Sequence, residues 1–327
     1  MSAPLLAVRG LGKTFVIKDG GRRVAVPAVR DVSFDVNAGE AVALVGESGS
    51  GKTTTARLIA RLETPTTGAI RVHGEDVLQT EPRRPSLGFR SRVQMIFQDP
   101  FASLNPFHTI AYHLARPLLR HRKARSGPDV AAAVRRLLET VGLTPADDFA
   151  RKRPHQASGG QRQRVAVARA LAVDPQLILA DEPTSMLDVS IRIDLLNLMR
   201  DLKTQRGLGY LLITHDLGAA RYFADRILVM YAGLIVESAA SDVLLDAPLH
   251  PYTQLLVAAV PSPQAPLRPA GPIALTASRP IGAAGASTGC PFADRCPQVM
   301  DRCLTELPPF RTVASGHDVR CHLYVTG

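Results

Sequence analysis

Gly46-Glu47-Ser48-Gly49-Ser50-Gly51-Lys52-Thr53 is the stretch that decides the fold of this chain. An apolar run over residues 41–45 precedes it and is typical of a buried strand, and a helical pattern over residues 54–62 follows it. The spacing G-x-x-x-x-G-K-T between a strand and a helix is that of a phosphate-binding loop. A surface turn rich in glycine and serine is the alternative interpretation, and the flanking strand and helix argue against it.

The loop carries the chemistry that a nucleotide polyphosphate needs. Its glycines allow backbone N–H groups to turn inward, and the start of the following helix adds a partial positive charge. We expect Lys52 to reach the terminal phosphates and the Thr53 hydroxyl to ligate Mg²⁺. The residues expected to contact the nucleotide here are Gly46, Glu47, Ser48, Gly49, Ser50, Gly51, Lys52, Thr53 and Thr54.

The size and charge of the chain limit the classes of protein to which it can belong. Its 327 residues allow about two domains that each bury a core. The net charge of +10 favours anionic partners such as nucleotides, an acidic membrane surface or nucleic acid, although a basic solvated surface has the same charge. No apolar run approaches the ~18 residues of a membrane-spanning helix, and the N-terminus lacks the core of a signal peptide. We therefore expect a cytosolic protein that at most docks on a membrane.

Strands and helices alternate along most of the chain. The predicted strands cover residues 5–17, 24–29, 32–36, 41–45, 69–72, 93–97, 177–180, 210–214, 227–230 and 234–236. The early strands form a small antiparallel sheet with a turn at residues 19–21, and Asp129 is expected to cap a helix over 130–140. Further helices are expected over 158–172 and 191–202. The pattern predicts an α/β protein whose mostly parallel sheet has helices on both faces.

Four polar residues follow apolar strands and should meet at one edge of this sheet. They are Gln98, Asp181, Glu182 and His215. Asp181 can hold Mg²⁺, Glu182 can polarise an attacking water, and His215 can donate to the γ-phosphate, while Gln98 can touch the metal or the water. The alternatives are a solvated second acid for Glu182, a structural histidine and a capping amide.

Ser158-Gly159-Gly160-Gln161 opens another helix and is a second anion site of the same physical kind. A single ATP can use only one of the two helix starts from the same side. The presence of both in one chain therefore needs an explanation.

Together these motifs resemble the nucleotide-binding subunit of an ABC transporter over about residues 5–240. Residues 46–53 are similar to Walker A, 177–182 to Walker B, 157–161 to the LSGGQ signature and 185–188 to the D-loop, with Gln98 as the Q-loop glutamine and His215 as the switch histidine. Phe15 lies where the family places an aromatic that stacks on adenine. Ala157 replaces the signature leucine and Met186 the usual D-loop alanine, and both changes leave the phosphate-contacting positions intact.

The resemblance implies an ATPase with a RecA-like P-loop NTPase core, an antiparallel β subdomain and a helical subdomain at about residues 101–172. In the family, two such domains dimerise head to tail, with ATP between Walker A of one and the signature of the other. Ser158, Gly159, Gly160, Gln161 and Asp188 would then contact the nucleotide of the partner, which accounts for the second anion site. One copy of each motif implies a second ATPase subunit, either a paralogue or another copy.

The branch of the family is indicated by three segments. Residues 97–106 and 250–253 are similar to the oligopeptide, dipeptide and nickel importers, and residues 289–297 resemble their C-terminal domain. This implies a nucleotide-binding domain over 1–240 and a C-terminal domain over 241–327. Within the latter, the composition of residues 261–289, rich in Pro, Ala, Gly and Ser, predicts a linker or irregular stretch before the cysteines. The resemblance also implies uptake of di- or oligopeptides, or of nickel or another small solute, with two permease subunits and an extracytoplasmic substrate-binding protein. The subunit would lie peripherally on the cytoplasmic side of the inner membrane.

Other ABC proteins fit less well. A DNA-repair or chromosome-organising ATPase would suit the charge, but the stretch between Gln98 and Ser158 is too short for a long coiled-coil insertion. Translation-type ABC proteins carry two ATPase domains in one chain. In other importer branches the tail would be a small β-barrel, whereas the tail of this chain contains cysteines. We expect no nucleic-acid partner.

Four cysteines, Cys290, Cys296, Cys303 and Cys321, occur within the last 38 residues with the spacing C-x5-C-x6-C-x17-C. Clustered thiols can hold an iron–sulfur cluster or zinc, although zinc more often shows C-x2-C pairs. Some relatives with this tail are thought to bind a [4Fe-4S] cluster. A disulfide is disfavoured in a reducing cytosol, and four packed free thiols are the remaining alternative.

Overall fold

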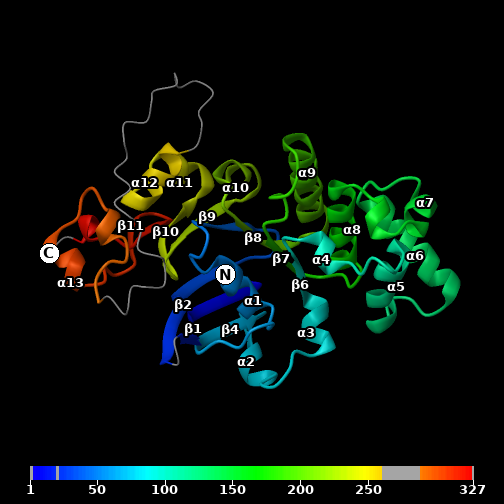
Figure 1. Ribbon diagram of the computed structural model, residues 1–327, viewed down its shortest axis with the longest axis horizontal. Coiled ribbons are helices and arrows are strands. Elements are labelled where there is room, and N and C mark those ends of the chain that lie inside the picture. The colour runs from blue at the N-terminus through cyan, green and yellow to red at the C-terminus, as the bar shows by residue number, and fades with distance from the viewer. Residues whose placement is uncertain (1–2, 20–21, 260–287, 326–327) are drawn as a thin grey trace.

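The computed structural model describes residues 3–19, 22–259 and 288–325, and its strands form two sheets (Figure 1). The smaller sheet is antiparallel and has the order β2 (Arg22–Val36), β1 (Leu6–Asp19), β4 (Thr67–Val72) and β5 (Glu75–Asp76). The larger sheet has the order β11 (Arg311–Ala314), β12 (His317–Val319), β10 (Leu234–Ala240), β9 (Arg226–Tyr231), β3 (Ala41–Val45), β8 (Gly209–Thr214), β7 (Leu177–Asp181) and β6 (Val93–Ile96). The strands from β9 to β6 are parallel, as the alternating pattern predicts.

The central strand β3 is buried on both faces of the larger sheet. Its alternate residues Ala41, Ala43 and Val45 belong to a core shared with the helices on one face. Val42 and Leu44 belong to a second core, which also contains residues of β1 and of α1 (Lys52–Ile59). A strand buried on both faces is a continuous apolar run, and this is the pattern by which the sequence predicts it.

A mainly helical part follows β6 and lies at the right of Figure 1. It consists of α4 (Pro100–Ser103), α5 (Ile110–Arg120), α6 (Gly127–Thr140), α7 (Ala146–Arg151), η1 (Pro154–Gln156) and α8 (Gly159–Leu171). The predicted cap of α6 is wrong: Ser126 is the N-cap, and Asp129 is the third helical residue of a reciprocal capping box. The other described helices between α1 and residue 250 are α2 (Val77–Thr80), α3 (Leu87–Arg92), α9 (Val189–Arg206), α10 (Leu217–Phe223) and α11 (Ser241–Asp246).

The C-terminal residues extend the larger sheet. β12 pairs with β10 through Glu237 and Val319, and the helical turns nearby are α12 (Pro251–Ala258), η2 (Ala293–Arg295), α13 (Asp301–Thr305) and η3 (His322–Tyr324). The buried Glu237 carboxylate accepts the backbone N–H groups of Leu249 at 2.8 Å and His250 at 2.9 Å, and lies 2.8 Å from Nε2 of His317. Residues 20–21 of the predicted turn at 19–21 and most of the predicted irregular stretch at 261–289 lie outside the described residues.

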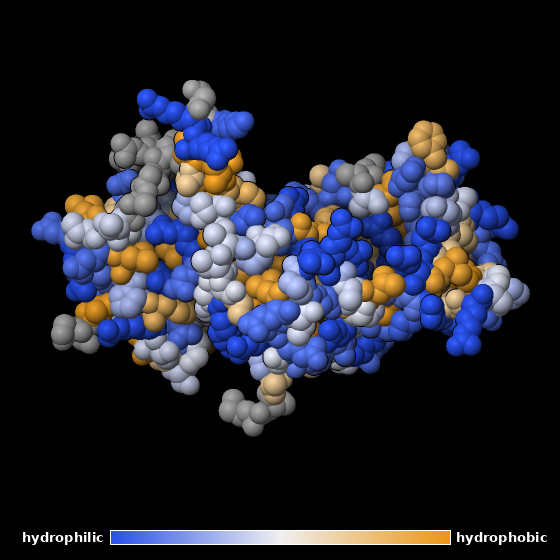
Figure 2. All heavy atoms as spheres, turned by 90° about the horizontal axis from the view of Figure 1, so that it is seen from below, coloured by the Kyte–Doolittle hydropathy of each residue, from blue (hydrophilic) through white to orange (hydrophobic). Residues whose placement is uncertain are grey.

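The architecture confirms the predicted α/β class, with a parallel core, an antiparallel sheet and a helical part. Among the described residues, no helix combines the length and the apolar character needed to cross a membrane. The face drawn in Figure 2 is mostly hydrophilic, with apolar side chains in small, separated groups. The domain boundary near residue 240 stays a prediction.

Candidate active site

The phosphate loop runs from the end of β3 to the start of α1, and two of its glycines are required by close backbone contacts. Gly46 has φ 154° and Gly51 has φ 107°, values that residues with a side chain rarely adopt. A Cβ atom would lie 2.2 Å from the carbonyl oxygen of Met230 at Gly46 and 2.3 Å from that of Ala28 at Gly51. Gly51 is the N-cap of α1 and provides no side-chain cap, so no side-chain acceptor occupies the start of this helix.

The Lys52 side chain bends back toward the phosphate loop and bonds to its backbone. The side chain is buried, and Nζ donates to the carbonyl oxygens of Gly46 at 2.7 Å and Glu47 at 2.8 Å. Burial lowers the pKa of Lys52, and the nearby carboxylates of Glu182 and Asp181 oppose this shift. The Lys52 amino group therefore lies against the backbone of the loop, close to where an anion bound by the loop would lie.

Thr53 and Asp181 come together as a pair of hard oxygen donors. The Thr53 hydroxyl donates to Oδ1 of Asp181 at 3.0 Å, across the end of β7. Burial raises the pKa of Asp181, the bond from Thr53 opposes this, and the neighbouring Glu182 charge adds to it. A buried carboxylate beside a hydroxyl suits Mg²⁺, which is commonly held by one or two protein oxygens together with substrate phosphates.

Glu182 is placed between the two other strand-end residues. Nε2 of Gln98 donates to Oε2 of Glu182 at 3.1 Å, and Nδ1 of His215 lies 3.3 Å from Oε1. Glu182 has φ 45°, in the left-handed region, and its N–H donates to the carbonyl oxygen of Ile213 at 2.9 Å. The structure thus gathers all four strand-end residues at the phosphate loop, and their individual roles remain predictions.

The signature residues belong to a different part of the molecule. Ser158 is the N-cap of α8, and it exchanges hydrogen bonds with Gln161 in a capping box, at 3.0 and 3.2 Å. A Cβ atom at Gly160 would lie 2.5 Å from Cγ2 of Ile191, so this glycine permits close packing of α8 on α9. Asp188 is exposed at the start of α9 and makes no side-chain cap.

Phe15 is partly buried on β1, opposite Val26 of β2. The Lys13 ammonium lies 4.8 Å from the centroid of its ring. One ring face thus already has a cationic neighbour, and the stacking of adenine on Phe15 remains a prediction.

Two residues that contact the loop were missed by the sequence analysis. The N–H of Glu47 donates to the Tyr252 hydroxyl at 2.9 Å, and the Arg295 guanidinium forms two bonds with the Glu47 carboxylate, at 2.9 and 3.0 Å. These partners are 205 and 248 residues away in sequence. No spacing or motif signals such a contact.

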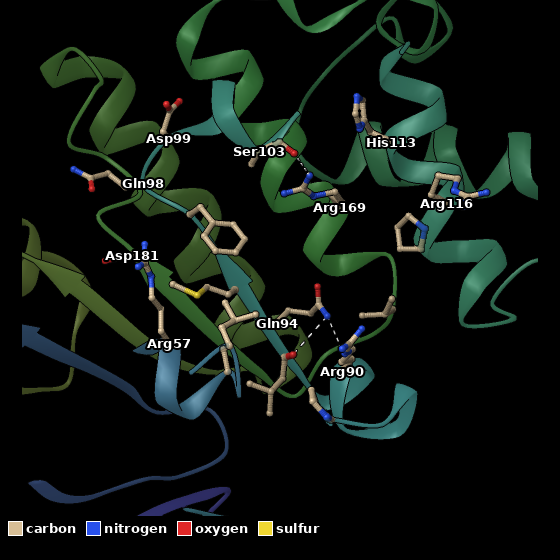
Figure 3. Close-up of a pocket in the computed structure, with 18 of the residues that line it drawn as sticks. Arg57, Arg90, Gln94, Gln98, Asp99, Ser103, His113, Arg116, Arg169 and Asp181 are labelled. Atoms are coloured by element: carbon tan, nitrogen blue, oxygen red, sulfur yellow. Dashed lines mark hydrogen bonds between the residues drawn. The ribbon is translucent and has the colours of Figure 1, made fainter. Parts of the chain in front are cut away.

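A cavity of about 900 Å³ opens beside the site, between the core and the helical part (Figure 3). Thr53, Gln98 and Asp181 line it on the side of the core. His113, Arg116 and Arg169 come from the helical side. Arg169 donates to the carbonyl oxygen of Ser103 at 2.6 Å, which ties α8 to the end of α4. The cavity therefore connects the expected metal site to the surface of the helical part.

The four cysteines line one small cavity, and all four are free thiols. In the described parts of the chain, no group of three or more His, Cys, Asp or Glu side chains is arranged to hold a metal ion. The predicted iron–sulfur cluster is therefore not supported. Burial raises the pKa of Cys290 to about 11, which keeps this thiol protonated.

Comparison with known proteins agrees with this geometry. A family model described as "ABC transporter" matches residues 29–185, and one described as "Oligopeptide/dipeptide transporter, C-terminal region" matches residues 236–303. The oligopeptide transport ATP-binding protein OppF of Bacillus subtilis is 49% identical over 80% of this chain and 84% of its own length. A putative peptide import ATP-binding protein of Brucella ovis is 44% identical over 97% of both chains.

The chain belongs to the ABC transporter family. It is an ATP-binding, ATP-hydrolysing subunit of that family. Among solved structures, a dimeric bacterial ABC transporter cassette is 31% identical, with a TM-score of 0.63 over 72% of this chain and 98% of its own. The structure of a dimeric cassette in a post-hydrolysis state with ADP and phosphate is 30% identical, with a TM-score of 0.64 over the same shares. The ABC ATPase fold thus accounts for about three quarters of the chain.

Proposed function

We propose that this ABC ATPase couples ATP hydrolysis to the import of di- or oligopeptides across the cytoplasmic membrane. The observation that carries the proposal is the match of residues 236–303 to the oligopeptide/dipeptide transporter C-terminal region. Relatives named for oligopeptide transport and peptide import, at 49% and 44% identity, support it.

The geometry supports a separate role for each of the site residues. Lys52 would exchange its two carbonyl partners for phosphate oxygens, and the glycine-rich backbone would supply further donors. Mg²⁺, when bound by Thr53 and Asp181, would neutralise phosphate charge. Glu182 would accept the proton of the attacking water, while Gln98 and His215 hold the two carboxylate oxygens of Glu182.

We infer that the working unit contains two ATPase subunits. Ser158 and Asp188 are exposed, and Ser158 bonds with Gln161 on its own helix. They are thus available to the nucleotide of a second subunit, a paralogue or another copy. The related solved cassettes are described as dimeric.

The cavity beside Gln98 is the proposed docking place for a cytoplasmic helix of a permease. It is lined from both the core and the helical part, so a helix seated there would touch Gln98 and Arg169 together. The full assembly would contain two permeases and an extracytoplasmic substrate-binding protein. The ATPase would then lie peripherally on the cytoplasmic side of the membrane.

The function is tested by reconstituting the ATPase with its permeases and binding protein in proteoliposomes. ATP-dependent uptake of a labelled pentapeptide is expected, and Lys52→Ala should abolish it, whereas Lys18→Ala, at an exposed position, should not. Accumulation of Ni²⁺ without peptide would contradict the substrate class. ATP hydrolysis stimulated by DNA, without co-purifying permeases, would contradict transport.

The cysteine segment has its own test. The [4Fe-4S] cluster is a proposal that rests on the four cysteines of the sequence, which line one cavity but do not form a metal site in the described arrangement. Anaerobically purified protein with bound iron and absorption near ~400 nm would establish the cluster. A colourless, iron-free protein would leave four packed thiols.

A further inference from the structure

The C-terminal segment, residues 288–325, contacts the phosphate loop through an ion pair. The guanidinium of Arg295 meets both carboxylate oxygens of Glu47, with Nη2–Oε1 at 2.9 Å and Nη1–Oε2 at 3.0 Å. The Arg295 side chain is 22% exposed and that of Glu47 33%, so the pair is partly shielded from water. A bidentate geometry of this kind fixes orientation as well as distance.

An aromatic cluster holds Arg295 in this position. Phe292 and Tyr252 are buried, and their rings lie 5.5 Å apart, each next to Tyr231. The guanidinium lies 5.9 Å from the Tyr231 ring and 5.7 Å from the Phe292 ring. Arg295 itself ends the short helical turn η2, which follows Phe292 directly.

Glu47 is held at three points. Its N–H bonds to Tyr252, its carbonyl oxygen accepts from Lys52, and its carboxylate is paired with Arg295. The Glu47 charge lies in the loop that is expected to bind a triphosphate. Without a counter-charge, this carboxylate would repel the phosphates and leave the loop less ordered.

We propose that Arg295 is a positioning residue of the ATP site, which neutralises Glu47 and holds the phosphate loop ready for the nucleotide. The C-terminal segment is then a part of the ATP site of its own chain. The proposal rests on nucleotide binding by this loop, and it adds a residue outside the ATP-binding motifs.

The test measures binding of the fluorescent nucleotide mant-ATP with Mg²⁺ to the full-length protein, with Glu182→Gln present to prevent turnover. Arg295→Gln is expected to weaken binding about five- to tenfold, and Arg295→Lys, which keeps the charge, about twofold. Arg311→Gln removes the same charge from an exposed site in the same segment and should change nothing. In a Glu47→Gln background, Arg295→Gln should have less than about a twofold effect, because no carboxylate is left to neutralise.

Three outcomes would overturn the proposal. The first is normal binding by a folded Arg295→Gln variant. The second is an equal loss with and without Glu47→Gln, which would indicate a general structural role for Arg295. The third is failure of the wild-type loop to bind mant-ATP, which would also remove the proposed function, whereas the first two would leave that function intact. Should Arg295→Gln fail to fold, the comparison of Arg295→Lys in the two backgrounds decides in the same way.

Discussion

Glu182 has a backbone conformation that residues with a side chain seldom adopt, and its surroundings keep it there. Its φ of 45° is held by the bond from its N–H to the carbonyl oxygen of Ile213. Strained residues of this kind persist where the neighbouring structure over-determines them. Gln98 and His215 contact one carboxylate oxygen each, so the Glu182 side chain is held from two sides.

Glu182→Gln is predicted to keep ATP binding and to lose at least about 100-fold in turnover, because an amide cannot accept the proton of water. Steady-state ATP hydrolysis and equilibrium nucleotide binding check the two halves of the prediction. Glu139→Gln, at an exposed position on α6, is the control and should retain both. Unchanged turnover in Glu182→Gln would show that another group is the base.

At the scale of elements, the start of α8 is constrained from two sides. Its first turn presents the signature, and its other side packs on α9 at a distance that admits no side chain at Gly160. Gly159, one residue earlier, has only ordinary contact distance to Leu187, at 3.8 Å. Close packing against Ile191 therefore requires a glycine at residue 160, whereas residue 159 has room for a side chain.

Gly160→Ala is predicted to be less stable than Gly159→Ala by about 1–2 kcal/mol. The added methyl group at residue 160 meets the stiff, β-branched Ile191, and overpacking of this kind costs about that amount. Both variants gain the same helix propensity, so the difference between them isolates the packing. Urea unfolding measures it, and equal midpoints would contradict the close packing of α8 on α9.

The start of α12 depends on a buried histidine whose surroundings favour the neutral imidazole. Nδ1 of His250 accepts the N–H of Tyr252 at 3.0 Å and caps the helix. Burial lowers the pKa of His250 from 6.5 to about 4. The unfolded chain therefore binds a proton between these two values, and the folded chain does not.

This difference predicts that the free energy of unfolding falls as the pH is lowered from about 6.5 to 4. The loss attributable to His250 is about 3 kcal/mol. His250→Asn keeps a side-chain acceptor for the cap but cannot titrate, so its unfolding free energy should depend less on pH in this range. Urea unfolding at several pH values checks this, and parallel curves for the two proteins would refute it.

At the scale of the whole molecule, the chain contains the parts of a shared site without the means to complete it alone. The phosphate loop and the adjoining strand end bring together Lys52, Thr53, Asp181 and Glu182. In the described structure, the Ser158 hydroxyl is bonded to its own helix rather than to that loop. A second ATPase subunit placed head to tail would bring the two halves together.

Glu182→Gln with ATP is therefore predicted to form a dimer, with itself or with a paralogous ATPase. Ser158→Arg should prevent dimer formation, because the bulky side chain would occupy the proposed nucleotide contact. Ser126→Arg removes a capping-box serine of the same kind from α6 and is the matched control. Light scattering coupled to size exclusion reads the mass, and a protein that stays monomeric with every candidate partner would refute the shared site.

Local patterns in the sequence were sufficient for the parallel core and for the residues at its edge. β3 is predicted to the residue because a strand buried on both faces is uninterrupted in its apolar character. Asp181 and Glu182 were predictable for a related reason, since a strand end is visible as the point where that run stops. At α6, the sequence analysis placed the cap at Asp129, whereas Ser126 is the N-cap and Asp129 is its partner in the capping box.

What only the tertiary structure decided is how the C-terminal segment meets the loop. Cys290 and its neighbours suggest a metal site by spacing, yet the described arrangement forms none. Arg295 and Tyr252 carry no signal of their contact with Glu47, because it joins segments 248 and 205 residues apart. The phosphate loop could be read from the chain, since strand, glycines and helix are contiguous there. The side chains that hold Glu47 could not, because their positions follow from the packing of the aromatic cluster around Phe292.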